Sequence, residues 1–94
     1  MNSSGEGNQA LVSIITLNYN RAEITAAFLE SSKNLLYPHY EILVCDMASS
    51  VNPATVFDVT AYPNTRLLLS KKNLGFASGN NWGMRQAKGD YIFI

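Results

Sequence analysis

Four short apolar runs, separated by polar segments, constrain the fold of this chain more than any other feature. They span residues 11–17, 40–45, 66–70 and 91–94 and are rich in aliphatic and β-branched side chains. The first two are apolar at successive positions, as expected of strands buried on both faces inside a parallel sheet. Strands that alternate with helices indicate an α/β fold with right-handed crossovers. The sequence therefore predicts a three-layer α/β/α arrangement around a mostly parallel sheet.

The segment between the first two strands has helical periodicity. Asn20 and Glu23 have the spacing of a capping box, with Asn in place of Ser or Thr. The pattern predicts a helix that ends near Tyr37-Pro38. Its inward face is predicted to carry Ile24, Ala27, Phe28, Ser31 and Leu35. Further along the chain, Pro53 predicts a short helix that reaches about residue 59.

Three glycines, Gly75, Gly79 and Gly83, recur at every fourth position, so on a helix they form one stripe without side chains. Each interior glycine costs about 1 kcal/mol relative to alanine, so the stripe needs a compensating contact. One interpretation is close packing of the helix on the sheet. The other is that the loop and the start of the helix lean over a polar, anionic ligand.

Polar loops follow each of the first three strands, at residues 18–21, 46–50 and 71–75. Ligands of parallel α/β sheets bind outside the carboxyl ends of the strands, so these loops are expected to converge on one edge. Asp46 either caps a neighbouring turn or accepts hydrogen bonds from a base or ribose. Tyr19 either stacks on a planar base or packs over the first helix.

Composition narrows the function classes. The 94 residues suit one small domain, and a formal net charge of zero gives no support for a nucleic-acid or membrane-surface partner. Between residues 65 and 90, however, five basic residues face one acidic residue, which suits either a phosphate-bearing ligand or a solvated basic face. No apolar segment reaches the 18 residues of a membrane span.

The remaining residues point to a cytoplasmic protein without an internal disulfide. Cys45 has no second cysteine to pair with, and its apolar surroundings predict a buried thiol. Residues 1–10 are polar and are interpreted as a flexible leader that lacks the features of a signal peptide.

Several familiar sites are missing from the sequence. The glycines do not spell G-x-G-x-x-G, there is no lysine-serine phosphate loop, and the single histidine allows no metal or Ser-His-Asp constellation. The sequence therefore assigns no catalytic residue and no metal ligand.

Three segments together resemble family 2 glycosyltransferases of the GT-A fold. Their amino-acid sequences are most similar to those of rhamnosyltransferase-like members. Residues 12–21 resemble the first strand and loop of that family, and residues 37–46 its second strand with a terminal aspartate. Residues 73–91 are similar to the segment that precedes the metal motif of the family. The resemblance covers about residues 11–94.

The resemblance implies that residues 11–94 bind a nucleotide-diphospho-sugar of the UDP or dTDP type. It implies that the backbone near Leu17 and the Tyr19 ring contact the base, that Asp46 accepts from the imide N–H, and that Arg21 approaches the diphosphate. The implied site residues are Leu17, Tyr19, Asn20, Arg21, Asp46, Asn73, Gly75, Asn80 and Asn81.

The chain departs from the family in two places. The usual Asp-Asn-x-Ser-x-Asp is here residues 46–51, with Met47 and Val51 in place of polar residues. The family's D-x-D-like motif, which binds Mg²⁺ or Mn²⁺, follows the fourth strand, and this sequence stops at Ile94 before it. The resemblance thus implies the donor-binding part of an enzyme that transfers sugar to a saccharide or lipid-linked acceptor. The chain alone is expected to be inactive and to self-associate through its incomplete sheet. The alternative is a non-catalytic α/β module that binds a nucleotide or a partner chain.

Overall fold

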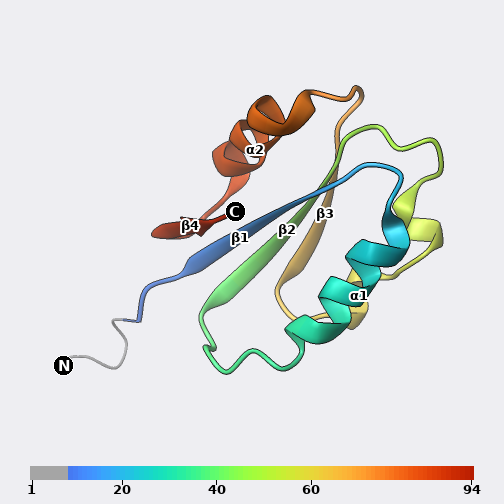
Figure 1. Ribbon diagram of the computed structural model, residues 1–94. Helices are drawn as coiled ribbons and strands as arrows, with labels where there is room; N and C mark the ends of the chain where they lie inside the picture. The colour runs from blue at the N-terminus through green and yellow to red at the C-terminus, as the bar shows by residue number, and fades with distance from the viewer. Residues whose placement is uncertain (1–8) are drawn as a thin grey trace.

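A computed structural model describes residues 9–94 of the chain. Most of the predicted leader, residues 1–8, lies outside the described residues. Four strands and two helices alternate along the chain, with two 3₁₀ turns, η2 and η3, before the third strand (Figure 1). Their bounds are β1 Val12–Asn18, α1 Ala22–Ser32, β2 Tyr40–Asp46, η2 Pro53–Thr55, η3 Val59–Ala61, β3 Thr65–Leu69, α2 Gly75–Gln86 and β4 Tyr91–Phe93.

The four strands form one sheet in the order β3-β2-β1-β4, and every pair is parallel. β1 and β2 pair along their whole length, from Val12 opposite Tyr40 to Asn18 opposite Asp46. β4 is shorter, and it pairs with β1 from Val12 to Ile14. The predicted α/β fold with a parallel sheet is confirmed.

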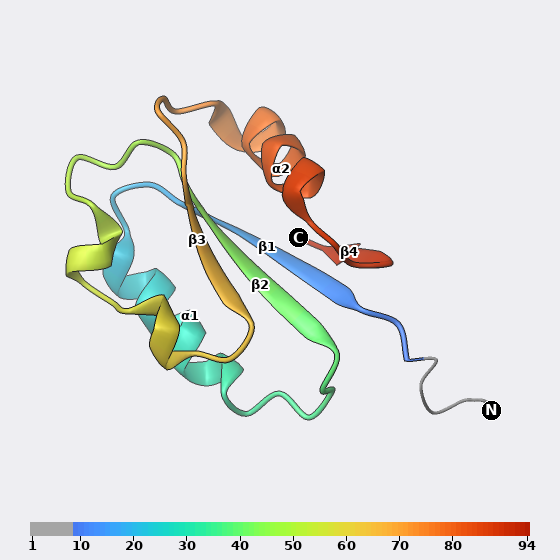
Figure 2. The ribbon, with the colours of Figure 1, turned by 180° about the vertical axis from the view of Figure 1, so that it is seen from behind.

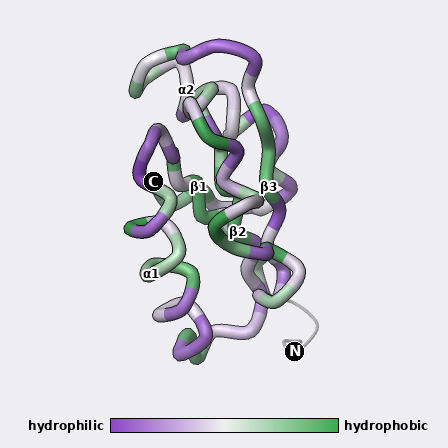
Figure 3. The backbone as a smooth tube through the Cα atoms, turned by 90° about the vertical axis from the view of Figure 1, so that its right-hand side faces the viewer, coloured by the Kyte–Doolittle hydropathy of each residue, from purple (hydrophilic) through white to green (hydrophobic). Residues whose placement is uncertain are grey.

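The two helices cover opposite faces of the sheet, so the predicted three layers are present (Figures 1 and 2). Successive β2 side chains point to opposite faces. Ile42 and Val44 therefore pack with Leu29 of α1 and with Phe57, whereas Leu43 and Cys45 pack with Ile15 and Met47 beneath α2. In Figure 3 the most hydrophobic stretches of the tube follow the strands, between the two helices.

The glycines of α2 serve two different purposes. A Cβ on Gly79 would lie 2.9 Å from Met47 Sδ, and one on Gly83 would lie 2.8 Å from Cys45 Sγ. Both positions are therefore close-packing positions that bring the helix against the sheet. Gly75 differs, because its φ is +81° and nothing lies within 4 Å of its Cβ position. Packing explains two of the three glycines, and a left-handed turn explains the third.

The predicted end of α1 was wrong, and so was most of its predicted inward face, of which Phe28 packs against the core. The buried residues are Thr25, Leu29 and Ser32, whereas the Ile24 side chain is 61% exposed. Thr25 bonds to the end of β1 and Leu29 enters the core, and together they fix the rotation of the helix. The helix ends at Ser32, whose hydroxyl donates to the Leu29 carbonyl at 2.6 Å.

The two predicted helix starts also differ from the structure. The N-cap of α1 is Arg21, and no side chain caps the helix. Asn20 cannot form the predicted capping box because its carboxamide oxygen accepts from the Ser50 N–H at 2.8 Å. The helix predicted from Pro53 to residue 59 is two separate 3₁₀ turns, capped by Asn52 and Asp58.

Candidate functional site

The ends of β1, β2 and β3 and the start of α2 lie at the same end of the sheet (Figure 1). We call this end the carboxyl rim and define it as residues 17–21, 46–52 and 69–75. It is the position at which parallel α/β sheets bind their ligands.

A buried hydrogen-bond network joins the ends of β1 and β2. The Asn18 amide donates to Asp46 Oδ1 at 2.9 Å, and Thr25 Oγ1 donates to Asn18 Oδ1 at 2.6 Å. The Ser49 hydroxyl donates to Asp46 Oδ1 at 2.6 Å, and its N–H donates to Asp46 Oδ2 at 3.0 Å. Asn18 and Asp46 are almost fully buried, and their polar atoms are paired within the protein. The network holds the first two rim loops in one arrangement.

The next layer of the rim joins the same two loops through backbone groups. The Asn20 N–H donates to Ser49 Oγ at 2.9 Å, and the Ser50 N–H donates to Asn20 Oδ1 at 2.8 Å. Asn20 and Ala48 have left-handed backbones, with φ values of 53° and 63°. Asn tolerates this conformation, but for Ala it is a strained one, so the loop after β2 is held in place at an energetic cost.

The third rim loop joins the second at the Asp46 backbone. The Ser70 N–H donates to the Asp46 carbonyl at 2.8 Å. The Asn73 carboxamide accepts from the Gly75 N–H at 2.9 Å, which forms a tight turn at the start of α2. All three loops are therefore ordered at one edge of the sheet.

Two hollows flank Ser49 at the rim. The smaller, of about 240 Å³, is lined by Asn18, Asn20, Ala22, Glu23, Ser49, Val51 and Val56. The larger, of about 400 Å³, is lined by Asp46, Ala48, Ser49, Ser50, Asn52, Pro53, Leu69, Ser70 and Lys71. The lining of the larger hollow includes hydroxyl, amide and carboxylate groups and one basic residue, Lys71.

The structure brings some of the predicted site residues together and separates others. Asn20 and Asp46 meet through Ser49. Tyr19 is 47% exposed. Asn80 is buried in the middle of α2 and lines a different hollow, beside Leu17. The predicted residues whose side chains or backbones are exposed at the surface are Tyr19, Asn20, Arg21, Asn73, Gly75 and Asn81.

The sequence prediction missed three residues of the rim network, namely Asn18, Thr25 and Ser49. Asn18 ends β1 at the same register as Asp46 ends β2. Two apolar strands that each end in one polar residue were therefore a usable signal for this pair. Ser49 corresponds to the serine in the family's Asp-Asn-x-Ser-x-Asp, so the resemblance also pointed to it.

The predicted basic segment between residues 65 and 90 does not form one surface. Arg66 lies at the opposite end of the sheet, where its guanidinium is 3.4 Å from Glu41 Oε1 and donates to the Gln86 carbonyl at 2.8 Å. Lys88 also lies there, because its N–H donates to Glu41 Oε2. Lys71 and Lys72 follow β3 at the carboxyl rim. A phosphate at the rim would therefore meet two of these five basic residues.

Two shifted pKa values describe the chemistry away from the rim. Burial raises the pKa of the Cys45 thiol to about 11, against a smaller lowering by Arg66, so the thiol is protonated and is no nucleophile at neutral pH. Burial also acts to raise the pKa of Glu41. Hydrogen bonds from Ser13 and from the Lys88 N–H, together with Arg66, outweigh that effect and lower it.

The described residues do not form a metal site. Within residues 9–94, no group of three or more His, Cys, Asp and Glu side chains is arranged to hold a metal ion. Asp46, the carboxylate at the rim, accepts three hydrogen bonds from Asn18 and Ser49.

Comparison with known proteins adds the family. The profile of the family described as "Glycosyl transferase family 2" matches residues 13–94, which is most of the chain. The chain belongs to glycosyltransferase family 2.

Curated relatives agree with this assignment. The family 2 chain is 36% identical over 84 residues to WfgD of Escherichia coli, named a UDP-Glc:α-D-GlcNAc-diphosphoundecaprenol β-1,3-glucosyltransferase. It is 33% identical over 86 residues to YwdF of Bacillus subtilis, an uncharacterised glycosyltransferase. These alignments cover 87% and 88% of the chain, which spans 32% and 31% of the two relatives.

A solved structure confirms the fold. The mannosyltransferase PcManGT of Pyrobaculum calidifontis, solved in complex with GDP-Man and Mn²⁺, superposes with a TM-score of 0.80 at 23% identity. The match covers 89% of the family 2 chain and 26% of that protein. Among the described residues, neither helix of the family 2 chain has the length and apolar character needed to cross a membrane.

Proposed function

We propose that the carboxyl rim binds a nucleotide-diphospho-sugar and that residues 11–94 are the donor-binding part of a glycosyltransferase. The observation that carries this proposal is the Asn18–Asp46–Ser49 network, which fixes two polar loops side by side at the ligand-binding end of the sheet. Preorganised loops lower the cost of binding, because less ordering is required when the ligand arrives.

Each proposed contact is made by a group that is exposed to solvent or that can still accept a hydrogen bond. The half-exposed Tyr19 ring stacks on the base, and the backbone at Leu17 contacts its edge. Asp46 Oδ2 accepts one hydrogen bond from the protein, and a carboxylate oxygen can accept a second, here from an imide N–H. Arg21 reaches the diphosphate. The ribose and phosphate side is shaped by Asn20, Asn73, Gly75 and Asn81, whereas the buried Asn80 faces the separate hollow beside Leu17.

The donor is proposed to be a UDP- or dTDP-sugar and the acceptor a saccharide or a lipid-linked sugar. The named activity of WfgD, which transfers from UDP-Glc to a diphosphoundecaprenol-linked GlcNAc, supports a donor and an acceptor of these kinds. A second relative, WfaP of Escherichia coli, has the same named activity and is 32% identical over 84 residues. These bacterial relatives fit a role in cell-envelope polysaccharide synthesis.

Transfer is proposed to need Mg²⁺ or Mn²⁺ held by residues beyond this sequence. The Mn²⁺ in the PcManGT complex supports cation use by a protein of this fold. Residues 9–94 form no cation site of their own. The 94-residue chain is therefore expected to bind a nucleotide weakly, with little dependence on the metal, and to transfer no sugar.

The cellular location of the chain and its self-association are also proposals. We place it in the cytoplasm or at the cytoplasmic face of the membrane, where its unpaired cysteine stays reduced. Self-association is proposed through the outer edge of β4, where Tyr91 is 67% exposed and Phe93 is 65% exposed.

Calorimetric titration with UDP, dTDP and GDP, with and without Mn²⁺, tests the proposal. UDP or dTDP is expected to bind in preference to GDP. The chain offers matched controls for two contacts. Tyr19→Ala and Arg21→Ala are each expected to weaken binding about tenfold, the equivalent of about 1.4 kcal/mol. Tyr91→Ala and Arg85→Ala remove similar exposed side chains far from the rim and are expected to leave binding unchanged.

Equal losses at the rim and control positions would contradict the proposed site, and so would strong enhancement by Mn²⁺. Binding that survives all four substitutions would favour the alternative of a binding module whose ligand site lies elsewhere. Sugar transfer by the 94-residue chain above a protein-free control would contradict its proposed inactivity.

A further inference from the structure

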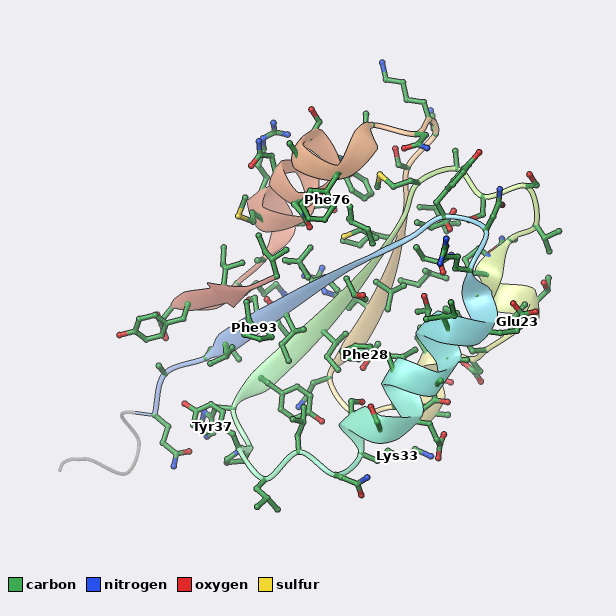
Figure 4. The ribbon with its side chains drawn as sticks, viewed as in Figure 1. Glu23, Phe28, Lys33, Tyr37, Phe76 and Phe93 are labelled. Atoms are coloured by element: carbon green, nitrogen blue, oxygen red, sulfur yellow. The ribbon has the colours of Figure 1, made fainter. Side chains whose placement is uncertain are left out.

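Thr25 is a polar residue on the buried face of α1, close to the start of the helix, and it is 6% exposed. Figure 4 marks this part of the helix with Glu23 and shows Phe28, further along, directed towards the sheet. Among the described side chains, none caps the start of α1. The Thr25 hydroxyl instead reaches another element, because it donates to Asn18 Oδ1 at the end of β1, at 2.6 Å.

The hydrogen bonds of the rim network all run in one direction, towards Asp46. Thr25 donates to the Asn18 carboxamide oxygen, and the Asn18 amide group donates to Asp46 Oδ1 at 2.9 Å. Ser49 donates its hydroxyl to Oδ1 and its backbone N–H to Oδ2 of the same carboxylate. The network therefore holds Asp46 as a hydrogen-bond acceptor, with Oδ2 still able to accept a second bond.

The orientation of the Asn18 carboxamide depends on Thr25. The oxygen and nitrogen ends of a carboxamide have nearly the same shape, so the partners of each end decide which way the group points. Thr25 supplies the donor for the oxygen. Asn18 is 1% exposed, so without this donor its oxygen is buried at a cost in free energy, which favours a turned carboxamide. The turned group would present its oxygen, instead of its N–H, to Asp46.

We propose that Thr25 is a positioning residue that makes the carboxyl rim select a base with an imide N–H. The inference rests on the proposed function, in which a nucleotide binds at the rim and Asp46 accepts from its base. Uracil and thymine carry an N–H on the imide nitrogen, whereas the corresponding ring nitrogen of cytosine carries a lone pair. An acceptor at this point therefore attracts the first two bases and repels the third.

UDP and CDP form the matched pair of ligands for the test, because their bases differ at this nitrogen and at the neighbouring ring substituent. Binding of each to the 94-residue chain is measured by NMR titration. The parent chain is expected to bind UDP about tenfold more tightly than CDP, since one hydrogen bond to a charged group distinguishes them. Thr25→Val keeps the shape of the side chain but removes the hydroxyl, and it is expected to reduce this ratio below about threefold.

Two further variants separate a change in selectivity from a loss of stability. Thr25→Ser keeps the hydroxyl and is expected to keep the selectivity of the parent, even where it lowers the free energy of unfolding. Ser32→Ala removes the other buried hydroxyl of α1, which donates to the Leu29 carbonyl within the helix. It is expected to leave the ratio of UDP to CDP affinities unchanged. A purely structural role for Thr25 would lower stability in Thr25→Val without changing this ratio.

The side-chain amide resonances of Asn18 provide a readout that needs no substitution. In the parent chain UDP is expected to shift them, and CDP at the same fractional saturation is expected to shift them less. Parent selectivity that persists in Thr25→Val, or Asn18 resonances that do not respond to UDP, would overturn this inference while the proposed function stands. A parent chain that binds neither nucleotide, or both equally, would contradict the proposed contact between Asp46 and the base as well.

Discussion

The two ends of the sheet each hold one buried carboxylate, but they use it differently. At the amino end, Glu41 accepts from the Ser13 hydroxyl and the Lys88 N–H, both at 2.6 Å, and pairs with Arg66. At the carboxyl rim, Asp46 accepts from neutral groups of Asn18 and Ser49. Both networks join residues that are far apart in the sequence, since Glu41 bonds to residues 28 and 47 positions away and Asp46 bonds to Asn18, 28 positions away.

We therefore assign a structural role to the amino end of the sheet and a ligand-binding role to the carboxyl rim. At the amino end, the Gly89 N–H donates to Ser13 Oγ at 2.8 Å, so the crossover from α2 into β4 is held against β1. The rim instead contains two left-handed residues, Asn20 and Ala48, and exposed side chains such as Tyr19 and Arg21. Strain and exposed polar groups are expected where a ligand binds, whereas a network of paired charges is expected where the fold is held together.

The largest effect is expected at the amino end. Glu41→Ala leaves the Ser13 hydroxyl, the Lys88 N–H and the Arg66 guanidinium without their shared acceptor. The free energy of unfolding is expected to fall by about 3 kcal/mol in urea titrations. Glu30→Ala is the matched control, because Glu30 forms an exposed pair with Lys33, and its effect is expected to be much smaller. Equal losses of unfolding free energy in Glu41→Ala and Glu30→Ala would contradict a special structural role for Glu41.

A smaller stability effect, with a larger effect on binding, is expected at the rim. Asp46→Ala removes the acceptor of three hydrogen bonds, which are made by neutral donors. It is expected to cost about 2 kcal/mol of stability in the same titrations. Nucleotide binding is expected to disappear from calorimetry, whereas Glu41→Ala, where it still folds, is expected to retain it. Retention of nucleotide binding by the Asp46→Ala chain would contradict the ligand-binding role of the carboxyl rim.

Acid should affect the amino end through Glu41. The pKa of Glu41 is lowered in the folded state, so its contribution to stability is present above the unfolded value of about 4.3 and is lost as pH falls through the folded pKa. Glu41→Gln cannot lose that contribution. Urea unfolding between pH 7 and 3 is therefore expected to show a stability gap between the parent and this variant of about 1–2 kcal/mol at pH 7 that narrows towards pH 3. A gap that is constant with pH would contradict the assignment.

The smallest effect is expected from relieving strain at the rim. Ala48 has a φ of 63°, which glycine adopts without a steric penalty. Ala48→Gly is expected to raise the thermal midpoint and to add about 0.5–1 kcal/mol of stability, because the strain exceeds the extra entropy of the unfolded chain. Ala27→Gly, at an exposed site in α1, is the control and is expected to lower stability by about 1 kcal/mol. Loss of stability in both variants would show that Ala48 is unstrained.

Much of the fold could be predicted from the sequence, because the strand and helix patterns are local. The strands begin and end within about a residue of their predicted bounds, and packing of α2 on the sheet was one of the two interpretations of the glycine spacing. The rotation of α1 could not be predicted in this way. Ile24 is more apolar than Thr25, yet Thr25 is the buried residue because it bonds to Asn18. That bond is formed between different elements and leaves no periodic signal in the sequence.

The candidate site was predicted less well, for a related reason. The position of each loop at the rim follows from the parallel direction of the strands, which the alternation of strands and helices predicts. Which side chains meet depends on register and on side-chain direction. Asn18 and Asp46 meet because β1 and β2 end opposite one another. Counting charges along the chain grouped Arg66 with Lys71, although a single strand, β3, places them at opposite ends of the sheet.

Chemical-shift mapping tests the central claim most directly. The ¹⁵N-labelled chain is titrated with UDP, and amide shifts are followed at both ends of the sheet. The account predicts that the largest changes occur at Tyr19, Ser49 and Gly75, while Lys88 and Gly89 stay in place. Changes centred on Lys88 and Gly89, or none at the rim at saturating nucleotide, would contradict it.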